Sequence, residues 1–150
     1  MRYATSLINK CLLVVICNIC SLYASAQGES NIWYFGNGAG LDFNSGGPVA
    51  LNNGSLFTTE GCATMSDKAG NLLFYTNGVT VWNAQHGVMS NGKGLIGNTS
   101  STQSALIIPK PGSATRYYIF TVGEKATGDG IAHSVVDMSA SGPTVEKFKN

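Results

Sequence analysis

Charged side chains are scarce in this sequence. Asp, Glu, Lys and Arg together make up 11% of its 150 residues, and the formal net charge is +1. A chain this close to neutrality lacks the basic excess with which proteins hold nucleic acid or anionic lipid. We therefore expect no nucleic-acid partner.

Cysteine is nearly absent beyond the N-terminus. Three of the four cysteines lie in an apolar run from Cys11 to Tyr23, which follows Arg2 and Lys10 and precedes Ala24-Ser25-Ala26. A basic flank, an apolar core and a cleavage site of small residues are typical of a secretory signal peptide. The run is shorter than the roughly 20 residues that a spanning helix needs. We predict a helical signal peptide over residues 1–26, cleavage between Ala26 and Gln27 by way of the general secretion (Sec) machinery, and no stable membrane span afterwards.

The chain after this leader keeps a single cysteine, Cys62. One thiol cannot form an intrachain disulfide or a cysteine metal site. A lone cysteine on a β-prone segment is most often a small buried hydrophobe. Stability must then come from apolar burial and backbone pairing.

Long helical patterns are also missing. All 19 glycines follow residue 27, and Gly, Pro or Asn interrupts nearly every window of 11 residues there. Such a chain, still rich in aromatic and β-branched residues, is typical of a turn-dense β protein. Residues 27–150 are predicted to form one all-β domain.

The block from Cys62 to Asn83 carries the clearest local pattern. Two β-prone runs, residues 72–76 and 79–82, flank Asn77-Gly78, the dipeptide that favours a type I′ hairpin turn. Before them, Asp67 can accept hydrogen bonds from following amides and Gly70 can adopt a left-handed conformation. We predict three strands in this block, the first two joined by the Asp67–Gly70 turn and the last two by the Asn77-Gly78 turn.

Further strands are expected on either side of this block. The segment 87–102 is rich in Gly, Asn and Ser, and Asn91-Gly92 is predicted to form another tight turn. The predicted strands are residues 31–35, 41–43, 103–108, 116–122 and 131–138, and residues 49–51 are a weak apolar segment between two predicted loops.

An approximate repeat runs through these strands. Tyr34, Tyr75 and Tyr118 are spaced by 41 and 43 residues, each within an aromatic run. A period of about 40–45 residues with several strands is typical of β-propeller blades. We predict about three incomplete blades of antiparallel hairpins, which form a fragment of a larger propeller because closure needs at least four blades. An immunoglobulin-like sandwich is the alternative.

Several motifs also resemble a known family. Ser66-Asp67-Lys68-Ala69-Gly70-Asn71-Leu72-Leu73-Phe74-Tyr75, with Asn31-Ile32-Trp33-Tyr34-Phe35-Gly36 and Tyr117-Tyr118-Ile119-Phe120-Thr121, resembles the N-terminal β-propeller-like region of gliding-motility-associated surface proteins of Bacteroidetes bacteria. In that family the propeller precedes repeats and a type B C-terminal sorting domain that the type IX secretion system recognises. The resemblance implies an exported, cell-surface or extracellular protein. The chain ends before such a domain, so type IX export is expected only if the natural chain continues, and a periplasmic location otherwise.

Candidate chemistry is sparse. His86 and His133 lie 47 residues apart, without the spacing of a local metal pair, and no calcium-loop pattern of aspartates occurs. We expect no catalytic residues, no metal and no cofactor, and a structural or interaction module that supports adhesion or gliding. The alternative is part of a secreted carbohydrate-active or other hydrolase propeller, with Asp67 or His133 in its site.

Aromatic residues remain the candidate contacts. Trp33, Trp82 and Tyr118 are predicted to fill the space between blades, or else to contact a surface glycan or a protein ligand.

Overall fold

The computed structural model describes residues 28–123, 130–139 and 142–148. The predicted signal peptide and its cleavage site at Ala26 and Gln27 lie outside the described residues. Within them the chain forms eleven β-strands and one short 3₁₀ helix, η1 (Gly28–Ser30). The all-β prediction is confirmed. No helix in the described ranges is long and apolar enough to cross a membrane.

The first sheet has three antiparallel strands. It contains β1 (Ile32–Gly36), β2 (Ala39–Asp42) and β3 (Val49–Leu51), in that order. Asn37 and Gly38 connect β1 to β2 with φ values of 52° and 75°. Two positive φ angles between paired strands are what a type I′ turn requires.

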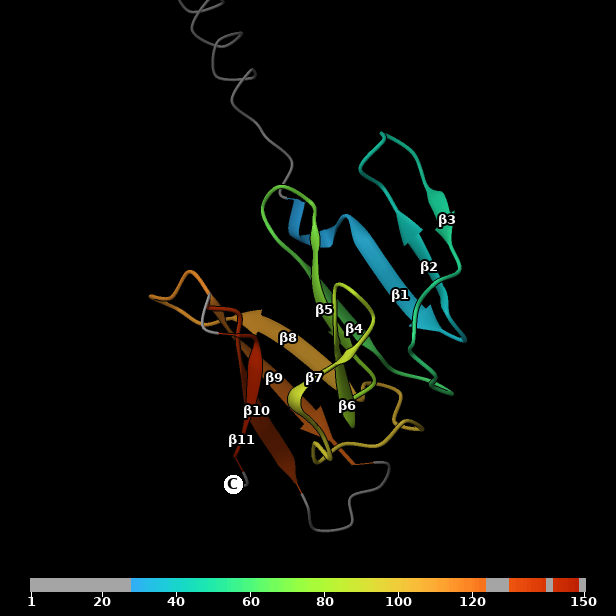
Figure 1. Ribbon diagram of the computed structural model, residues 1–150. Helices are drawn as coiled ribbons and strands as arrows, with labels where there is room; N and C mark the ends of the chain where they lie inside the picture. Colours follow the sequence, from blue (N-terminus) through green and yellow to red (C-terminus); the bar gives the residue numbers. More distant parts are fainter. Residues whose placement is uncertain (1–27, 124–129, 140–141, 149–150) are drawn as a thin grey trace, which may run out of the picture.

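The second sheet has eight strands arranged as two antiparallel meanders. The first meander contains β4 (Ala63–Ser66), β5 (Leu72–Thr76), β6 (Thr80–Asn83) and β7 (Val88–Lys93). The second contains β8 (Ala105–Pro109), β9 (Arg116–Val122), β10 (Ile131–Asp137) and β11 (Thr144–Phe148). Figure 1 shows the meander β4–β7, in green and yellow, between the blue first sheet and the orange and red second meander.

Two contacts bring the meanders into one nearly closed, barrel-like sheet. On one side β7 and β11 pair in parallel through Ser90 and Thr144, and the Asn91 side-chain amide donates to Val145 O over 2.7 Å. On the other side, just before β4 and β8, Ser104 Oγ donates to Gly61 O over 2.6 Å. The strand order is β4-β5-β6-β7-β11-β10-β9-β8.

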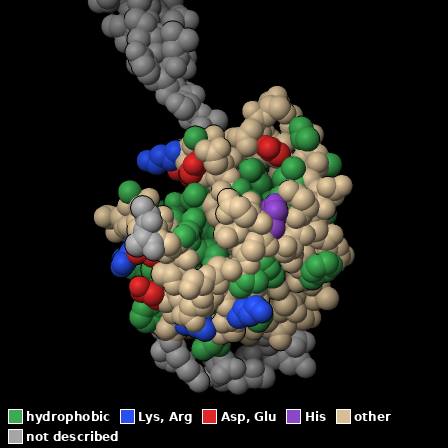
Figure 2. Space-filling view, viewed as in Figure 1, with side chains coloured by type: hydrophobic (Ala, Val, Ile, Leu, Met, Phe, Trp, Pro, Cys, Tyr) green, Lys and Arg blue, Asp and Glu red, His purple; other side chains and the backbone are tan. Residues whose placement is uncertain are grey.

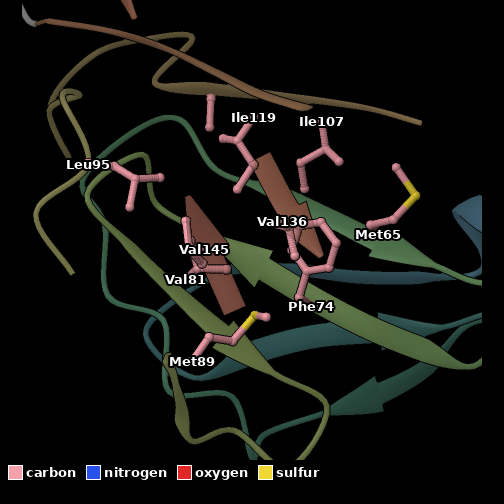
Figure 3. Close-up of a cluster of buried hydrophobic side chains, with 10 residues drawn as sticks. Met65, Phe74, Val81, Met89, Leu95, Ile107, Ile119, Val136 and Val145 are labelled. Atoms are coloured by element: carbon pink, nitrogen blue, oxygen red, sulfur yellow. The ribbon is translucent and has the colours of Figure 1, made fainter. Parts of the chain in front are cut away.

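The main core fills the space between the two meanders (Figure 3). Phe74 and Val81 from the first meander meet Ile119 and Val136 from the second, and all four side chains are fully buried. Every one of the eight strands contributes at least one side chain to this cluster. Burial of these side chains, each favourable by roughly 1.5–3 kcal/mol, holds the meanders face to face.

A second core lies between the first sheet and the other face of β5. Tyr34, Leu56 and Tyr75 are its buried members, and Trp82 packs against them from β6. Successive residues of β5 therefore face opposite cores: Phe74 belongs to the main core and Tyr75 to the second. The meander β4–β7 is consequently covered on both faces.

Most predicted strands exist, and two have the predicted bounds, β5 and β9. The weak apolar segment at residues 49–51 forms β3. Two turns differ. Asn77 does not have a positive φ, so the β5–β6 connection is not type I′. Asn91-Gly92 does not end a strand, because Asn91 takes a φ of 57° within β7.

The three aligned tyrosines do not occupy equivalent positions. Tyr34 lies on the first strand of the first sheet, whereas Tyr75 and Tyr118 lie on the second strands of the two meanders. Tyr34 and Tyr75 share one core, while Tyr118 lies outside both. The recurring unit in the structure is the meander itself, whose first strands begin at residues 63 and 105, 42 residues apart.

Candidate interaction surfaces

An apolar surface covers the outer side of the meander β8–β11. Leu106, Phe120 and His133 lie opposite one another on three neighbouring strands, and Phe148 continues the row on β11. Leu106 is 50% exposed and Phe148 is 44% exposed. We call this surface the C-terminal face, and it consists of Leu106, Ile108, Tyr118, Phe120, Ile131, His133 and Phe148.

The rings of the C-terminal face hold one another in place. His133 stacks on Phe148 with ring centroids 5.1 Å apart and an interplanar angle of 10°. Tyr118 and Phe120 are 5.9 Å apart, and the Lys110 ammonium lies 5.6 Å from the Tyr118 centroid. Packed side chains lose less conformational entropy when a partner covers them. The face is therefore suited to docking.

A second apolar surface lies at the opposite end, on the first sheet. Trp33 and Phe35 alternate with buried Tyr34 along β1 and are 51% and 49% exposed. The Trp33 ring lies 5.2 Å from Phe43, and its indole N–H donates to Ser30 O over 2.8 Å. We call Trp33, Phe35 and Phe43 the N-terminal face. Trp33 and Phe35 thus share one side of β1, and Ile32 and Tyr34 share the other.

A cavity of about 300 Å³ opens beside this face, between β1 and β4. There the Tyr34 N–H donates to Thr64 Oγ1 over 3.0 Å, and the Cys62 thiol donates to Tyr34 O over 3.2 Å. Burial raises the pKa of the Cys62 thiol. A protonated thiol in this place is a structural donor rather than a nucleophile.

His86 is held in a polar network behind the N-terminal sheet. The Tyr34 hydroxyl donates to Asn53 Oδ1 over 2.9 Å, and the Asn53 amide is 2.9 Å from His86 Nε2. His86 Nδ1 in turn lies 3.0 Å from the Tyr75 hydroxyl, which also accepts the Ser55 N–H. The Asn53 amide and the Tyr75 hydroxyl thus each contact one ring nitrogen of His86. Both ring nitrogens are therefore engaged in holding the second core.

The predicted turn residues lie in the loops of the first meander. Asp67 Oδ1 accepts the N–H groups of Ala69 and Asn71 at 2.8 and 2.9 Å, and Gly70 has a φ of 88°. Hydrogen bonds from Asn71, first from its side chain, lower the pKa of Asp67.

The next turn uses its asparagine differently from the prediction. Asn77 Oδ1 accepts the N–H groups of Val79 and Thr80, so its side chain rather than a left-handed backbone shapes the turn. Gly78 has a φ of 85° and lies directly against Ser104, where a Cβ would be 2.8 Å from the carbonyl oxygen. The turn is thus fitted to the segment that leads into the second meander.

The three aromatic candidates do not form one platform. Trp82 stacks on Tyr75 in the second core, with centroids 5.6 Å apart, whereas Trp33 belongs to the N-terminal face and Tyr118 to the C-terminal face. Trp82 is a packing residue, and the other two are available to partners at opposite ends.

Asp67 and His133, the candidate site residues of the hydrolase alternative, also lie on different elements. Asp67 is in the β4–β5 turn, while His133 stacks on Phe148 on the outer side of β10. Among residues 28–123, 130–139 and 142–148, no three His, Cys, Asp or Glu side chains converge on a position for a metal ion.

The sequence does not indicate that Glu29 lines a cavity. Glu29 of η1 lines a cavity of about 540 Å³ between the β4–β5 and β8–β9 turns. No motif surrounds Glu29 in the sequence, since the cavity assembles from three segments distant along the chain. In Figure 2 acidic and basic side chains lie next to each other near the grey segment at the top, and further charged groups are scattered over the rest of the visible face.

Comparison of the chain with protein-family models, with curated protein sequences and with solved structures gives no match.

Proposed function

We propose that this chain is a non-catalytic structural and interaction module of an exported cell-surface protein, built from sheets that stack as propeller blades do. One observation carries the proposal: the meander β4–β7 is covered on one face by the first sheet and on the other by the meander β8–β11. The first sheet and the meander β8–β11 each leave an apolar outer face. A stack of this kind extends by adding another sheet. Contiguous exposed apolar faces are typical of protein interaction sites.

The strand arrangement supports the blade interpretation. Each meander has four antiparallel strands in chain order, as a propeller blade does. The first strands of the first sheet and of the two meanders also lie side by side, β1 against β4 and β4 against β8. Adjacent first strands are expected where blades surround a common axis.

The proposed partner of the C-terminal face is another β-sheet. In the purified protein this sheet is the first sheet of a second copy, which binds through its N-terminal face. Both faces are aromatic and almost uncharged, so neither leaves buried unpaired charge when they meet. They lie at opposite ends of the stack, so the association is head to tail. Within a larger protein, a further blade would occupy the same face.

Export and surface location rest on the sequence. The signal-peptide pattern and the resemblance to surface proteins of gliding bacteria support them. Adhesion and gliding-associated roles belong to the same proposal. Recovery of the full chain, expressed in a Bacteroidetes host, from the periplasm or medium with Gln27 as its first residue would support export, and an uncleaved cytoplasmic product would contradict it.

Sedimentation velocity of residues 27–150 tests the interaction role. The unsubstituted protein is expected to associate as its concentration rises, and Phe120→Ser on the C-terminal face or Trp33→Ser on the N-terminal face is expected to weaken association at least tenfold. Phe57→Ser is the matched control, because Phe57 is 67% exposed but belongs to neither face. A protein that stays monomeric at every concentration, or association that neither variant reduces, would overturn the proposal.

A further inference from the structure

A cavity lies between corresponding turns of the two meanders. The β4–β5 turn contributes Asp67 and Lys68, the segment from β8 to β9 contributes Pro109, Arg116 and Tyr117, and η1 contributes Glu29. Its volume of about 540 Å³ falls in the range of roughly 300–1,000 Å³ common for small-molecule sites. Neither apolar face is part of it.

The charges around this cavity nearly balance. Glu29 and Asp67 are acidic, and Lys68 and Arg116 are basic. Two of the four are already engaged, since Asp67 closes its own turn and Arg116 Nε donates to Asp137 over 2.8 Å. A strongly anionic or cationic ligand would meet like charge here, so the cavity favours an uncharged polar ligand.

One carboxylate oxygen of Glu29 lacks a hydrogen-bond donor among the described residues. This Oε2 atom is buried and has no hydrogen-bond partner there. Leaving a buried carboxylate oxygen unpaired is costly, so a ligand that donates to it gains an interaction the free protein does not satisfy. Because Oε2 itself has almost no accessible surface, the Glu29 side chain has to turn toward the cavity for a ligand hydroxyl to fill this acceptor.

Tyr117 supplies an aromatic surface beside this acceptor. Its ring packs edge-on against Phe74, with centroids 5.4 Å apart, and is thereby fixed. Burial, and then the nearby charges of Asp67 and Glu29, raise the pKa of Tyr117, so its hydroxyl stays protonated. A fixed ring with a polar tip offers both a stacking face and a hydrogen bond.

We propose that this cavity binds a neutral saccharide. One sugar hydroxyl donates to Glu29 Oε2, another accepts from the Lys68 ammonium, and the carbon face of the ring lies on Tyr117. A saccharide carries adjacent donors and acceptors without net charge, which matches the mixed lining. The proposal is independent of the stacking faces, because no residue of either face lines the cavity.

Saturation-transfer NMR and titration calorimetry test this on residues 27–150. The probes are maltose, cellobiose, lactose and di-N-acetylchitobiose, with free glycine as a zwitterion of comparable polarity. We expect one or more disaccharides to bind and glycine not to. Glu29→Ala is expected to weaken that binding at least tenfold and Lys68→Ala severalfold, while Glu146→Ala, an exposed position on β11, leaves it unchanged.

Folding is monitored separately by thermal unfolding. Because Glu29 Oε2 is unpaired, Glu29→Ala is expected to leave the melting temperature equal or higher, so lost binding cannot be blamed on lost structure. Absence of binding by all four disaccharides would overturn the proposal, as would binding that survives Glu29→Ala. Glu29-dependent binding of glycine in their place would assign the cavity to zwitterions instead.

Discussion

The Tyr34 ring of β1 stacks on the Tyr75 ring of β5, with centroids 4.8 Å apart and an interplanar angle of 25°. Tyr75 also stacks on Trp82, with centroids 5.6 Å apart and an interplanar angle of 15°. This series of rings joins the first sheet to the first meander. Burial raises the pKa of the Tyr34 hydroxyl, and the neighbouring Tyr75 raises it as well, whereas the hydrogen bond to Asn53 lowers it.

Substitutions at Tyr75 separate the contribution of the ring from that of the hydroxyl. Tyr75→Phe removes the acceptor of the Ser55 N–H and should lower the free energy of unfolding by about 1–3 kcal/mol. Tyr75→Ala also removes the ring and should cost about 3–5 kcal/mol. Urea unfolding measures both. Tyr118→Phe, on the partly exposed C-terminal face, is the control and should change stability by less than about 0.5 kcal/mol.

Close backbone contact at Gly97 gives a second prediction. A Cβ at Gly97 would collide with Gly78 O, so Gly97→Ala forces the turn and the inter-meander segment apart. We expect a loss of roughly 1–3 kcal/mol in the free energy of unfolding. Gly47→Ala is the control, because no atom lies within 4 Å of its added Cβ. Equal stabilities of the two variants would contradict the close packing.

Acid should destabilise the protein through Asp137. The Ser139 N–H donates to Asp137 Oδ1 over 2.9 Å and Arg116 pairs with Oδ2, and both lower the pKa of this carboxyl, the Ser139 bond most. The unfolded chain then binds more protons as the pH falls below about 4, the usual pKa of Asp. Stability from this group is full above that pH and is lost as the pH falls through the lower, folded pKa.

Asp137→Asn should therefore flatten the fall of stability between about pH 5 and pH 2. Urea unfolding across this range measures the slope, and Glu146→Gln at an exposed position is the matched control. An unchanged slope in Asp137→Asn would show that Asp137 does not contribute to acid unfolding.

The Cys62 thiol should react slowly in the folded protein. Burial raises its pKa and its hydrogen donates to Tyr34 O, so the reactive thiolate is rare. Alkylation by iodoacetamide at pH 8 should be at least tenfold slower in the native protein than in 6 M urea. Equal rates would mean that the β1–β4 contact is open in solution.

Local patterns predicted the strands better than the turns. The runs at 72–76 and 116–122 are aromatic and β-branched and match β5 and β9. Asn37-Gly38 forms the type I′ geometry expected of Asn77-Gly78, because the Asn77 side chain instead bonds the following amides. At Asn91 a long-range bond to Val145 O allows a left-handed residue within a strand. Side-chain bonds of this kind cannot be read from a dipeptide.

The candidate surfaces were only partly predictable. Alternation correctly separates Trp33 from Tyr34, but in β9 both sides are apolar, so the sequence does not indicate whether Ile119 or Phe120 faces the core. Similarly, Trp82 and Trp33 look alike in the sequence, and only the stacking of sheets buries one and exposes the other. The Glu29 cavity depends on three separate segments and left no local signal.

A mixing experiment with two blocked proteins tests the stacking account most directly. Phe120→Ser disables the C-terminal face of one protein and Trp33→Ser the N-terminal face of the other, so each alone should be monomeric by sedimentation velocity. Mixed in equal amounts, they should form a one-to-one heterodimer, because one intact C-terminal face and one intact N-terminal face remain. Two monomers that stay separate on mixing, while the unsubstituted protein associates, would contradict head-to-tail stacking of these faces.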